Sequence, residues 1–127
     1  MITILGQVPS KSNGYKIGNN RLYKSKELKE YERIFANHIN LGLGDSREMI
    51  KEKFILEVRV YFRSNRSDLD NAAKIILDCL QSCRLIENDR LCEELHMYKD
   101  IDKEMPRIVF SLRKKNKIVN LNTSRYM

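Results

Sequence analysis

The feature that most constrains this chain is a change of hydrophobic period between residues 53 and 83. From Phe54 to Phe62 every second residue is apolar, which is typical of a strand with one buried face. From Leu69 to Cys83 the apolar residues recur at helical spacing and leave a single narrow polar stripe. We therefore predict a strand over 53–63 that leads through a short turn into a helix buried on most of its surface.

Shorter patterned segments lie on both sides of this unit. Residues 9–24 are mostly polar and broken by proline and glycine, so we predict a long loop there. The expected fold is a small α/β (α+β) domain with a mixed β-sheet of about four strands and two main helices. The remaining predicted elements are strands over 2–8, 91–99 and 107–112, and a helix capped by Ser25 that ends near Leu41 and is stopped by Gly42.

Length and charge indicate one domain and a polyanionic partner. A chain of 127 residues suits a single domain over 1–127, and we expect its basic end, 113–127, to be a flexible tail. The formal net charge of +7 draws polyanions, so nucleic acid is the favoured partner; the alternative is a basic surface without one. No apolar run approaches the ~20 residues of a membrane helix, and the first residues lack a signal peptide pattern. We therefore expect a cytoplasmic protein with no membrane contact and no small-molecule cofactor.

An acidic cluster stands at the predicted junction of strand and helix. Asp68 and Asp70 are two residues apart, so in extended backbone their carboxylates project to one side and favour a bound cation. Magnesium prefers such oxygen ligands and keeps several waters. Asp89 follows the helix and reaches the same place if the chain doubles back. We predict a Mg²⁺ site made by these three residues. The alternative is that Asp70, or Ser67, is only the N-cap of the helix.

The polar stripe of the predicted helix continues this cluster. Lys74 lies one turn beyond Asp70, where it could bind a phosphate or stabilise transition-state charge. Asp78, one more turn along, could orient Lys74, and Asn71 could bind a metal-bound water. Together with a metal that activates water, these groups suit phosphodiester hydrolysis. The alternative is that Lys74 and Asp78 form a surface ion pair worth a few tenths of a kcal/mol.

The segment 9–24 carries basic residues interleaved with Tyr15 and Tyr23. Such a pattern suits a surface that follows phosphates and stacks on bases. The alternative is a solvated loop whose tyrosines are anchored in the core. The basic residues predicted to bind nucleic acid here are Lys11, Lys16, Arg21 and Lys24.

Three cysteines open a different interpretation. With His96, the residues Cys79, Cys83 and Cys92 form a C-x3-C-x8-C-x3-H string, which could be a structural zinc site. The usual C-x2-C pair is missing, and an odd cysteine count without an export signal favours reduced thiols. Cys79 and Cys83 also lie among apolar residues of the predicted helix, where free cysteine acts as a small hydrophobe.

The central motif resembles that of a known family. Residues 66–80 read R-S-D-L-D-N-A-A-K-I-I-L-D-C-L, and 85–90 read L-I-E-N-D-R. This resembles the RusA family of Holliday junction resolvases, whose pattern is D-x-D-N-x-x-K-x-x-x-D-x-L followed by a hydrophobic pair and an acidic loop. By position, Asp68, Asp70 and Asp89 match the metal-binding aspartates of the family, and Lys74 matches its essential lysine. Asn88 departs from the family, which usually has two adjacent aspartates there.

The flanks match the family only in general character. Pro9 and Ser10, with Asn13 nearby, resemble its early proline-serine-asparagine loop, and the match includes the late strand that carries Lys99. We add Asn13 and Arg66 to the predicted nucleic-acid-binding residues.

The resemblance implies a homodimeric, Mg²⁺- or Mn²⁺-dependent endonuclease that nicks two strands of a four-way DNA junction symmetrically. It implies a role in recombination and repair, and phage or prophage relatives are common. A twofold protein suits a junction with two equivalent strands, and either strand 54–62 or the apolar side of helix 69–83 could supply the dimer surface. The alternatives are a non-catalytic basic DNA-binding module and a nuclease acting on other branched DNA.

Overall fold

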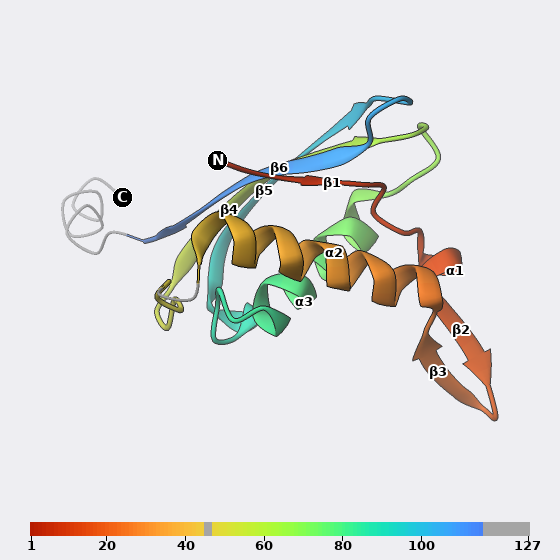
Figure 1. Cartoon of the computed structure of the whole chain (residues 1–127), viewed down its shortest axis with the longest axis horizontal. Helices are drawn as coiled ribbons and strands as arrows, with labels where there is room; N and C mark the ends of the chain where they lie inside the picture. Colours follow the sequence, from red (N-terminus) through yellow and green to blue (C-terminus); the bar gives the residue numbers. More distant parts are fainter. Residues whose placement is uncertain (45–46, 116–127) are drawn as a thin grey trace, which may run out of the picture.

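The computed structural model describes residues 1–44 and 47–115, which form one mixed four-stranded sheet, a separate hairpin and two main helices (Figure 1). This confirms the predicted α+β fold. No described helix is long and apolar enough to cross a membrane. The elements are β1 (Ile2–Leu5), α1 (Lys11–Gly14), β2 (Tyr15–Gly18), β3 (Arg21–Lys24), α2 (Lys26–Leu43), β4 (Phe54–Phe62), α3 (Leu69–Ser82), a 3-10 turn η1 (Asp89–Leu91), β5 (Cys92–Ile101) and β6 (Arg107–Lys114).

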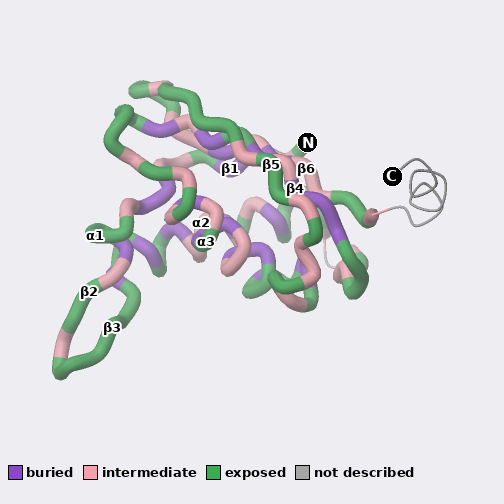
Figure 2. The backbone as a smooth tube through the Cα atoms, turned by 180° about the vertical axis from the view of Figure 1, so that it is seen from behind, coloured by how far each residue is buried: buried purple, intermediate pink, exposed green. Residues whose placement is uncertain are grey.

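The main sheet has the strand order β1-β6-β4-β5. Strand β4 pairs in parallel with β5 and antiparallel with β6, and β1 pairs antiparallel with β6. Helix α3 is the crossover between the two parallel strands, as a parallel pair requires. Both α2 and α3 cover the same face of the sheet, and none of the elements within residues 1–44 and 47–115 covers its other face (Figures 1 and 2).

The core lies between the two helices and the inner face of the sheet. The alternate apolar residues of β4 are almost fully buried there, and Phe35 of α2 stacks on Phe110 of β6 with ring centroids 6.0 Å apart. The prediction that β4 or the apolar side of α3 supplies a dimer surface is therefore wrong, because these two surfaces pack inside one chain. The buried residues are Phe54, Leu56, Val58, Val60 and Phe62 of β4 and Ala72, Ile75, Ile76, Cys79 and Leu80 of α3.

Helix α3 begins as predicted, but its N-cap is Asp68 rather than Asp70 or Ser67. Asp68 has extended backbone, and its Oδ1 accepts hydrogen bonds from the backbone N–H of Asp70 at 2.8 Å and of Asn71 at 3.3 Å. An aspartate in this position satisfies two of the free amide groups of the first turn. Asp70 therefore lies within the first turn, where its charge complements the helix dipole.

The prediction of a long loop over 9–24 is wrong. After α1 the chain forms the hairpin β2–β3, which projects from the body of the molecule (Figure 1). Its two-residue turn is made by Asn19 and Asn20, whose φ angles are 53° and 61°. A two-residue turn of this type needs positive φ at both positions, which asparagine tolerates. The asparagine pair was the signal for a hairpin.

Other boundaries differ by a few residues. Strand β1 ends at Leu5, and α2 continues to Leu43 because the residue with positive φ is Gly44, at 74°, and not Gly42. Strand β6 runs through Lys114, so the first residues of the predicted tail belong to the sheet. Residues 116–127 of that predicted tail lie outside the described residues.

The cysteines act as core residues rather than as zinc ligands. All three are free, and burial raises the pKa of Cys79 to about 12 and raises the pKa of Cys83 as well. The thiolate is the form that binds metal, so such thiols are poor ligands. Over residues 1–44 and 47–115, no three His, Cys, Asp or Glu side chains are grouped so that they could hold an ion. The zinc interpretation therefore has no structural support.

Candidate active site

The beginning of α3 faces a depression of about 540 Å³ between the helix and the β2–β3 hairpin. Asp68 and Asp70 lie on its helix side. Lys74 lies one turn further along, with its Nζ 5.4 Å from the ring centre of Tyr15 in β2. The structure thus brings two predicted carboxylates and the predicted lysine to one hollow. The residues that line it are Lys11, Tyr15, Ile17, Leu22, Asp68, Asp70, Asn71 and Lys74.

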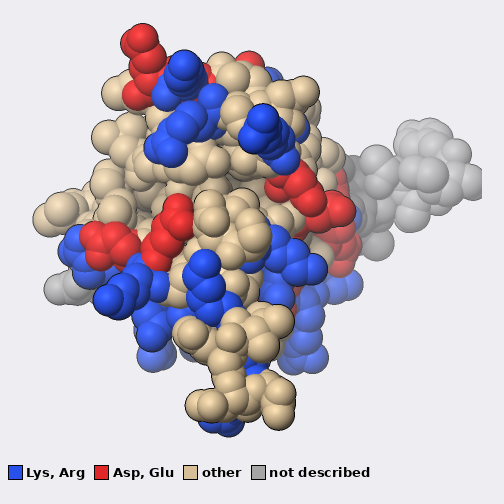
Figure 3. Space-filling view, turned by 90° about the vertical axis from the view of Figure 1, so that its right-hand side faces the viewer, with Lys and Arg blue, Asp and Glu red and all other residues tan. Residues whose placement is uncertain are grey.

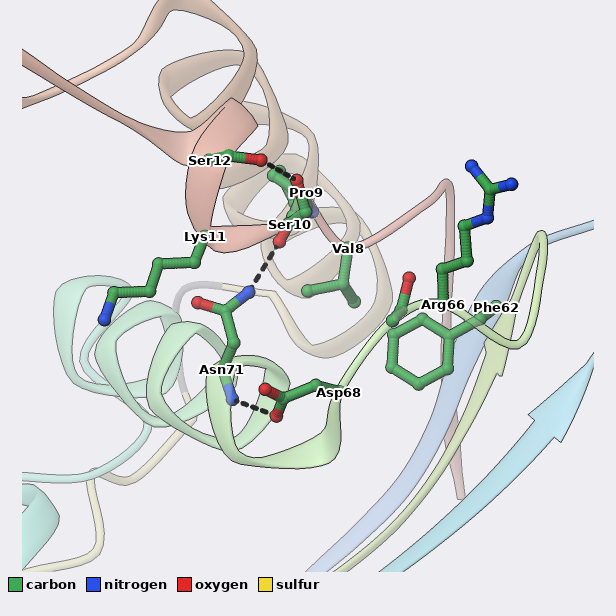
Figure 4. Close-up of a pocket in the computed structure, with 10 residues that line it drawn as sticks. Val8, Pro9, Ser10, Lys11, Ser12, Phe62, Arg66, Asp68 and Asn71 are labelled. Atoms are coloured by element: carbon green, nitrogen blue, oxygen red, sulfur yellow. Dashed lines mark hydrogen bonds between the residues drawn. The ribbon is translucent and has the colours of Figure 1, made fainter.

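Asn71 connects this helix end to the N-terminal segment. Its side-chain amide donates to the carbonyl of Pro9 at 2.9 Å (Figure 4). A second depression of about 460 Å³ lies beside this bond and is lined by Asp68, Lys11 and Arg66, among others. Figure 4 shows Asp68 between the helix and this hollow, with the guanidinium of Arg66 turned away from the carboxylate. Asn71 is thus a positioning residue for the first turn of α3.

Asp89 lies near the other end of α3. Its backbone N–H donates to the side chain of Gln81 at 3.0 Å. Gln81 is about three turns beyond Asp70, or ~16 Å at 1.5 Å per residue. The described residues contain no group of three acidic, histidine or cysteine side chains that could hold a metal ion. The loop after α3 does bring Asp89 back along the helix, but a triad with Asp68 and Asp70 is not present in one chain.

Asp78 lies on the polar stripe between these two ends. It is half-buried, and burial raises the pKa of its carboxyl; the positive charges of Lys74 and Lys24 partly offset this effect, while Asp89 adds to it. Asp78 is therefore within electrostatic reach of both Lys74 and Asp89.

The pKa of Asp78 leads to a prediction for stability. Because the folded-state pKa is raised, protonated Asp78 favours the folded state, and this contribution is lost as the pH rises through that pKa. We expect Asp78→Asn to be at least as stable as the wild type at pH 7. The difference should shrink as the pH falls below the ordinary carboxyl range. Urea unfolding at several pH values measures the difference in unfolding free energy between the variant and the wild type. A difference that favours the variant less at pH 7 than at pH 3.5 would contradict burial as the cause of the raised pKa.

Lys99 supports the turn before Asp68, a role that sequence patterns did not reveal. From β5 its Nζ donates to the backbone carbonyls of Asn65 at 3.0 Å and Ser67 at 2.6 Å. Its Nζ also lies 5.8 Å from the ring centre of Phe62, at the end of β4. Lys99 thus fixes the carbonyl that directly precedes Asp68. A lysine that donates hydrogen bonds to backbone carbonyls far away along the chain leaves no local signal in the sequence.

If Asp68 holds a metal for phosphodiester cleavage, Lys99→Met should lower the cleavage rate about tenfold or more, because a partner that orients a metal ligand typically contributes this much. The metal concentration for half-maximal cleavage should rise, while the unfolding midpoint changes little. Lys103→Met is a matched control, since it removes one exposed lysine from the turn after β5. Equal cleavage and equal metal dependence in the two variants would show that Lys99 has no positioning role.

The predicted nucleic-acid-binding residues divide into two groups. Lys11 lines both depressions beside Asp68, and Lys16 and Arg21 are exposed on the hairpin. Lys24 instead pairs with Glu32 of α2 at 2.7 Å, a bond that raises the pKa of Lys24. Asn13 is part of the backbone framework, because its N–H donates to Ser10 Oγ and its carbonyl accepts from the hydroxyl of Ser25.

The donor set at the start of α3 suits a hard divalent cation. Asp68 uses Oδ1 for the helix cap, and its Oδ2 is not part of that cap. Asp70 is exposed in the first turn and shares the depression with Asp68. Magnesium is commonly held by one or two carboxylates together with waters and substrate phosphates. These residues therefore fit an ion that is completed by solvent and by a bound phosphodiester.

Two carboxylates and a lysine around one hollow, in a basic chain, define a candidate phosphodiester-cleaving enzyme. A family model described as Endodeoxyribonuclease RusA matches residues 6–113, which is most of the chain. The chain belongs to the RusA family of endodeoxyribonucleases, hydrolases that resolve Holliday junctions. No curated protein sequence matches it.

Membership in the RusA family confirms the resemblance found in residues 66–90 and the predicted class of enzyme. The family acts on branched DNA junctions, and nucleases of this kind generally use a divalent metal. The matched range begins in the segment after β1 and ends within β6, so it includes α3, the hairpin and the turn held by Lys99.

Proposed function

We propose that this chain is a Mg²⁺-dependent, structure-selective endonuclease that resolves four-way DNA junctions by paired, symmetric nicks. The observation that carries the proposal is the joint placement of Asp68, Asp70 and Lys74 around the depression at the beginning of α3. The whole chain, 1–127, would act as one such domain.

In this proposal Asp68 and Asp70 hold the metal, for which Mn²⁺ can substitute. When bound, the metal supplies an activated water and neutralises charge on the phosphoryl oxygens. Lys74 binds the scissile phosphate from the adjacent turn, with its Nζ kept near the hollow by the Tyr15 ring. Asn71 holds the first helical turn against Pro9, so that both carboxylates keep their place.

Asp89 has a separate place in the proposal. Its position in the family pattern makes it a predicted catalytic and metal-binding residue, yet within one chain it lies beside Gln81. Asp89→Asn tests that role directly, since the substitution keeps the backbone bond to Gln81. Asp78, between Asp89 and Lys74, is proposed to support the charge balance along the stripe.

DNA binding is proposed to use basic groups on both sides of the carboxylates. Lys11 lies in the hollow itself and Arg66 lines the second depression, while Lys16 and Arg21 are exposed on the face of the hairpin that is turned away from the hollow. Such contacts are salt-dependent and position the backbone without reading sequence. A homodimer would present two such sites to the two equivalent strands of a junction.

The test is cleavage of a synthetic four-way junction whose strands are labelled in turn. With Mg²⁺ we expect nicks at symmetric positions in one opposing strand pair. We expect none in EDTA and little cleavage of a linear duplex of the same sequence. Salt-dependent binding without metal-dependent nicks would favour a non-catalytic DNA-binding module, whereas nicks in other branched DNA but not in the junction would change the substrate.

A further inference from the structure

Two large apolar side chains stand exposed at the edge of the candidate site. Ile17 of β2 is 80% exposed and Leu22 of β3 is 65% exposed. They are direct partners across the hairpin, so they share one face of it. That face lines the same depression as Asp68, Asp70 and Lys74. An apolar pair therefore lies opposite the carboxylates, on an element that projects from the body (Figures 1 and 2).

The hairpin does not need this pair for its own structure. At its base, buried Ser25 donates from its N–H to the carbonyl of Gly14 at 2.8 Å and from its hydroxyl to that of Asn13 at 2.6 Å. On the opposite face, Tyr23 packs across Gly18, where an added Cβ would lie 3.0 Å from the ring. The hairpin is thus fixed at its base and braced on its other face, while Ile17 and Leu22 face the depression.

The charge around the pair indicates what could cover it. Residues 11–24 contain four basic and no acidic residues. Lys24 is paired with Glu32, and Lys11 and Lys74 share the hollow with Asp68 and Asp70, so the surplus of positive charge lies on the hairpin, at the exposed Lys16 and Arg21. Figure 3 looks at this end of the molecule and shows Lys and Arg side chains on either side of the projecting hairpin. A second copy packed on this face would place two basic hairpins side by side, which is unfavourable. Nucleic acid with accessible bases is complementary to this face, because it combines a polyanionic backbone with apolar bases.

We propose that Ile17 and Leu22 form a wedge that inserts between bases at the branch point of the DNA, beside the scissile phosphate. Apolar side chains that enter a base step unstack it and bend the helix, while surrounding lysines and arginines hold the phosphates. Bases at a branch point are already weakly stacked, so insertion there costs less than in a duplex. The wedge therefore selects the branch and delivers the adjacent phosphate to Asp68 and Asp70. This inference rests on the proposed function, because it names how that site selects its substrate.

The test places 2-aminopurine, whose fluorescence rises on unstacking, at the branch of a four-way junction. Binding is measured without divalent metal, so the result does not depend on cleavage. We expect the wild type to raise the fluorescence and the double variant Ile17→Ser, Leu22→Ser to lose most of that rise. Leu41→Ser is the matched control, because Leu41 is 89% exposed near the end of α2, away from the hairpin. It should behave as the wild type.

Cleavage rates test the wedge and the nuclease activity separately. The double variant should cut an intact junction about tenfold more slowly or slower still, because the cost of unstacking the branch is no longer offset by the inserted side chains. It should cut a junction with unpaired bases at the branch at the wild-type rate. Equal fluorescence in variant and wild type would overturn the wedge and leave the nuclease intact. A variant that sediments as a smaller species than wild type would also overturn it, because the pair would then join two copies. A wild type that unstacks the branch but never nicks would count against the nuclease alone.

Discussion

Asp70→Asn is expected to abolish junction cleavage while the folded protein still binds junctions. The substitution removes one of the two proposed metal ligands and keeps the size of the side chain. Metal assistance to phosphodiester hydrolysis contributes several kcal/mol, so the rate should fall by at least ~10³. Binding should be equal or tighter, because a negative charge next to the DNA backbone is lost.

The structure predicts that folding is little affected by this change. Asp70 is exposed in the first turn of α3, and the helix cap is made by Asp68. The loss of a favourable charge at the helix start costs about 0.3–1 kcal/mol. Glu48→Gln, an exposed acid in the connection after α2, is a matched control that should cleave normally. Normal cleavage by Asp70→Asn would remove this residue from the metal site.

Lys74→Met is expected to lower the cleavage rate by about 10²–10³, the usual effect of losing one preorganised group that stabilises transition-state charge. Methionine keeps the aliphatic stem beside Tyr15, so the hollow should keep its shape. Single-turnover rates at saturating DNA measure the effect separately from binding. Lys51→Met, which removes an exposed lysine before β4, controls for the loss of one positive charge.

The same variant decides between two interpretations of Lys74. If Lys74 only formed a surface ion pair with Asp78, its removal would change stability by a few tenths of a kcal/mol and leave cleavage intact. A wild-type single-turnover rate for Lys74→Met would therefore favour that interpretation.

Much of the fold and part of the site could be predicted from sequence because they rest on local patterns. The alternating residues of β4 and the helical spacing of α3 each reflect one buried face, so both elements and their order were correct. Asp68 and Asp70 do line one depression, but Asp70 lies in the first turn of α3 and not in the extended backbone on which the prediction rested. The family was recognised because its motif lies within one continuous stretch.

The features that were missed depend on tertiary contacts or on backbone conformation. Lys99 acts on the turn before Asp68 from a strand that is distant in sequence. Asp89 was expected beside Asp68, but the bond to Gln81 holds it near the end of α3. The hairpin differs from the predicted loop because its turn depends on the positive φ angles of Asn19 and Asn20, a property of backbone conformation.

We propose that the metal and the scissile phosphate meet at the beginning of α3. Fe²⁺ in place of Mg²⁺, with ascorbate and hydrogen peroxide, generates radicals that cut a protein chain next to the bound ion. With junction DNA present, we predict cuts within about residues 66–71, mapped by mass spectrometry, and loss of these cuts in Asp70→Asn. Cuts confined to the other end of α3, around Asp78 to Asp89, would contradict this claim.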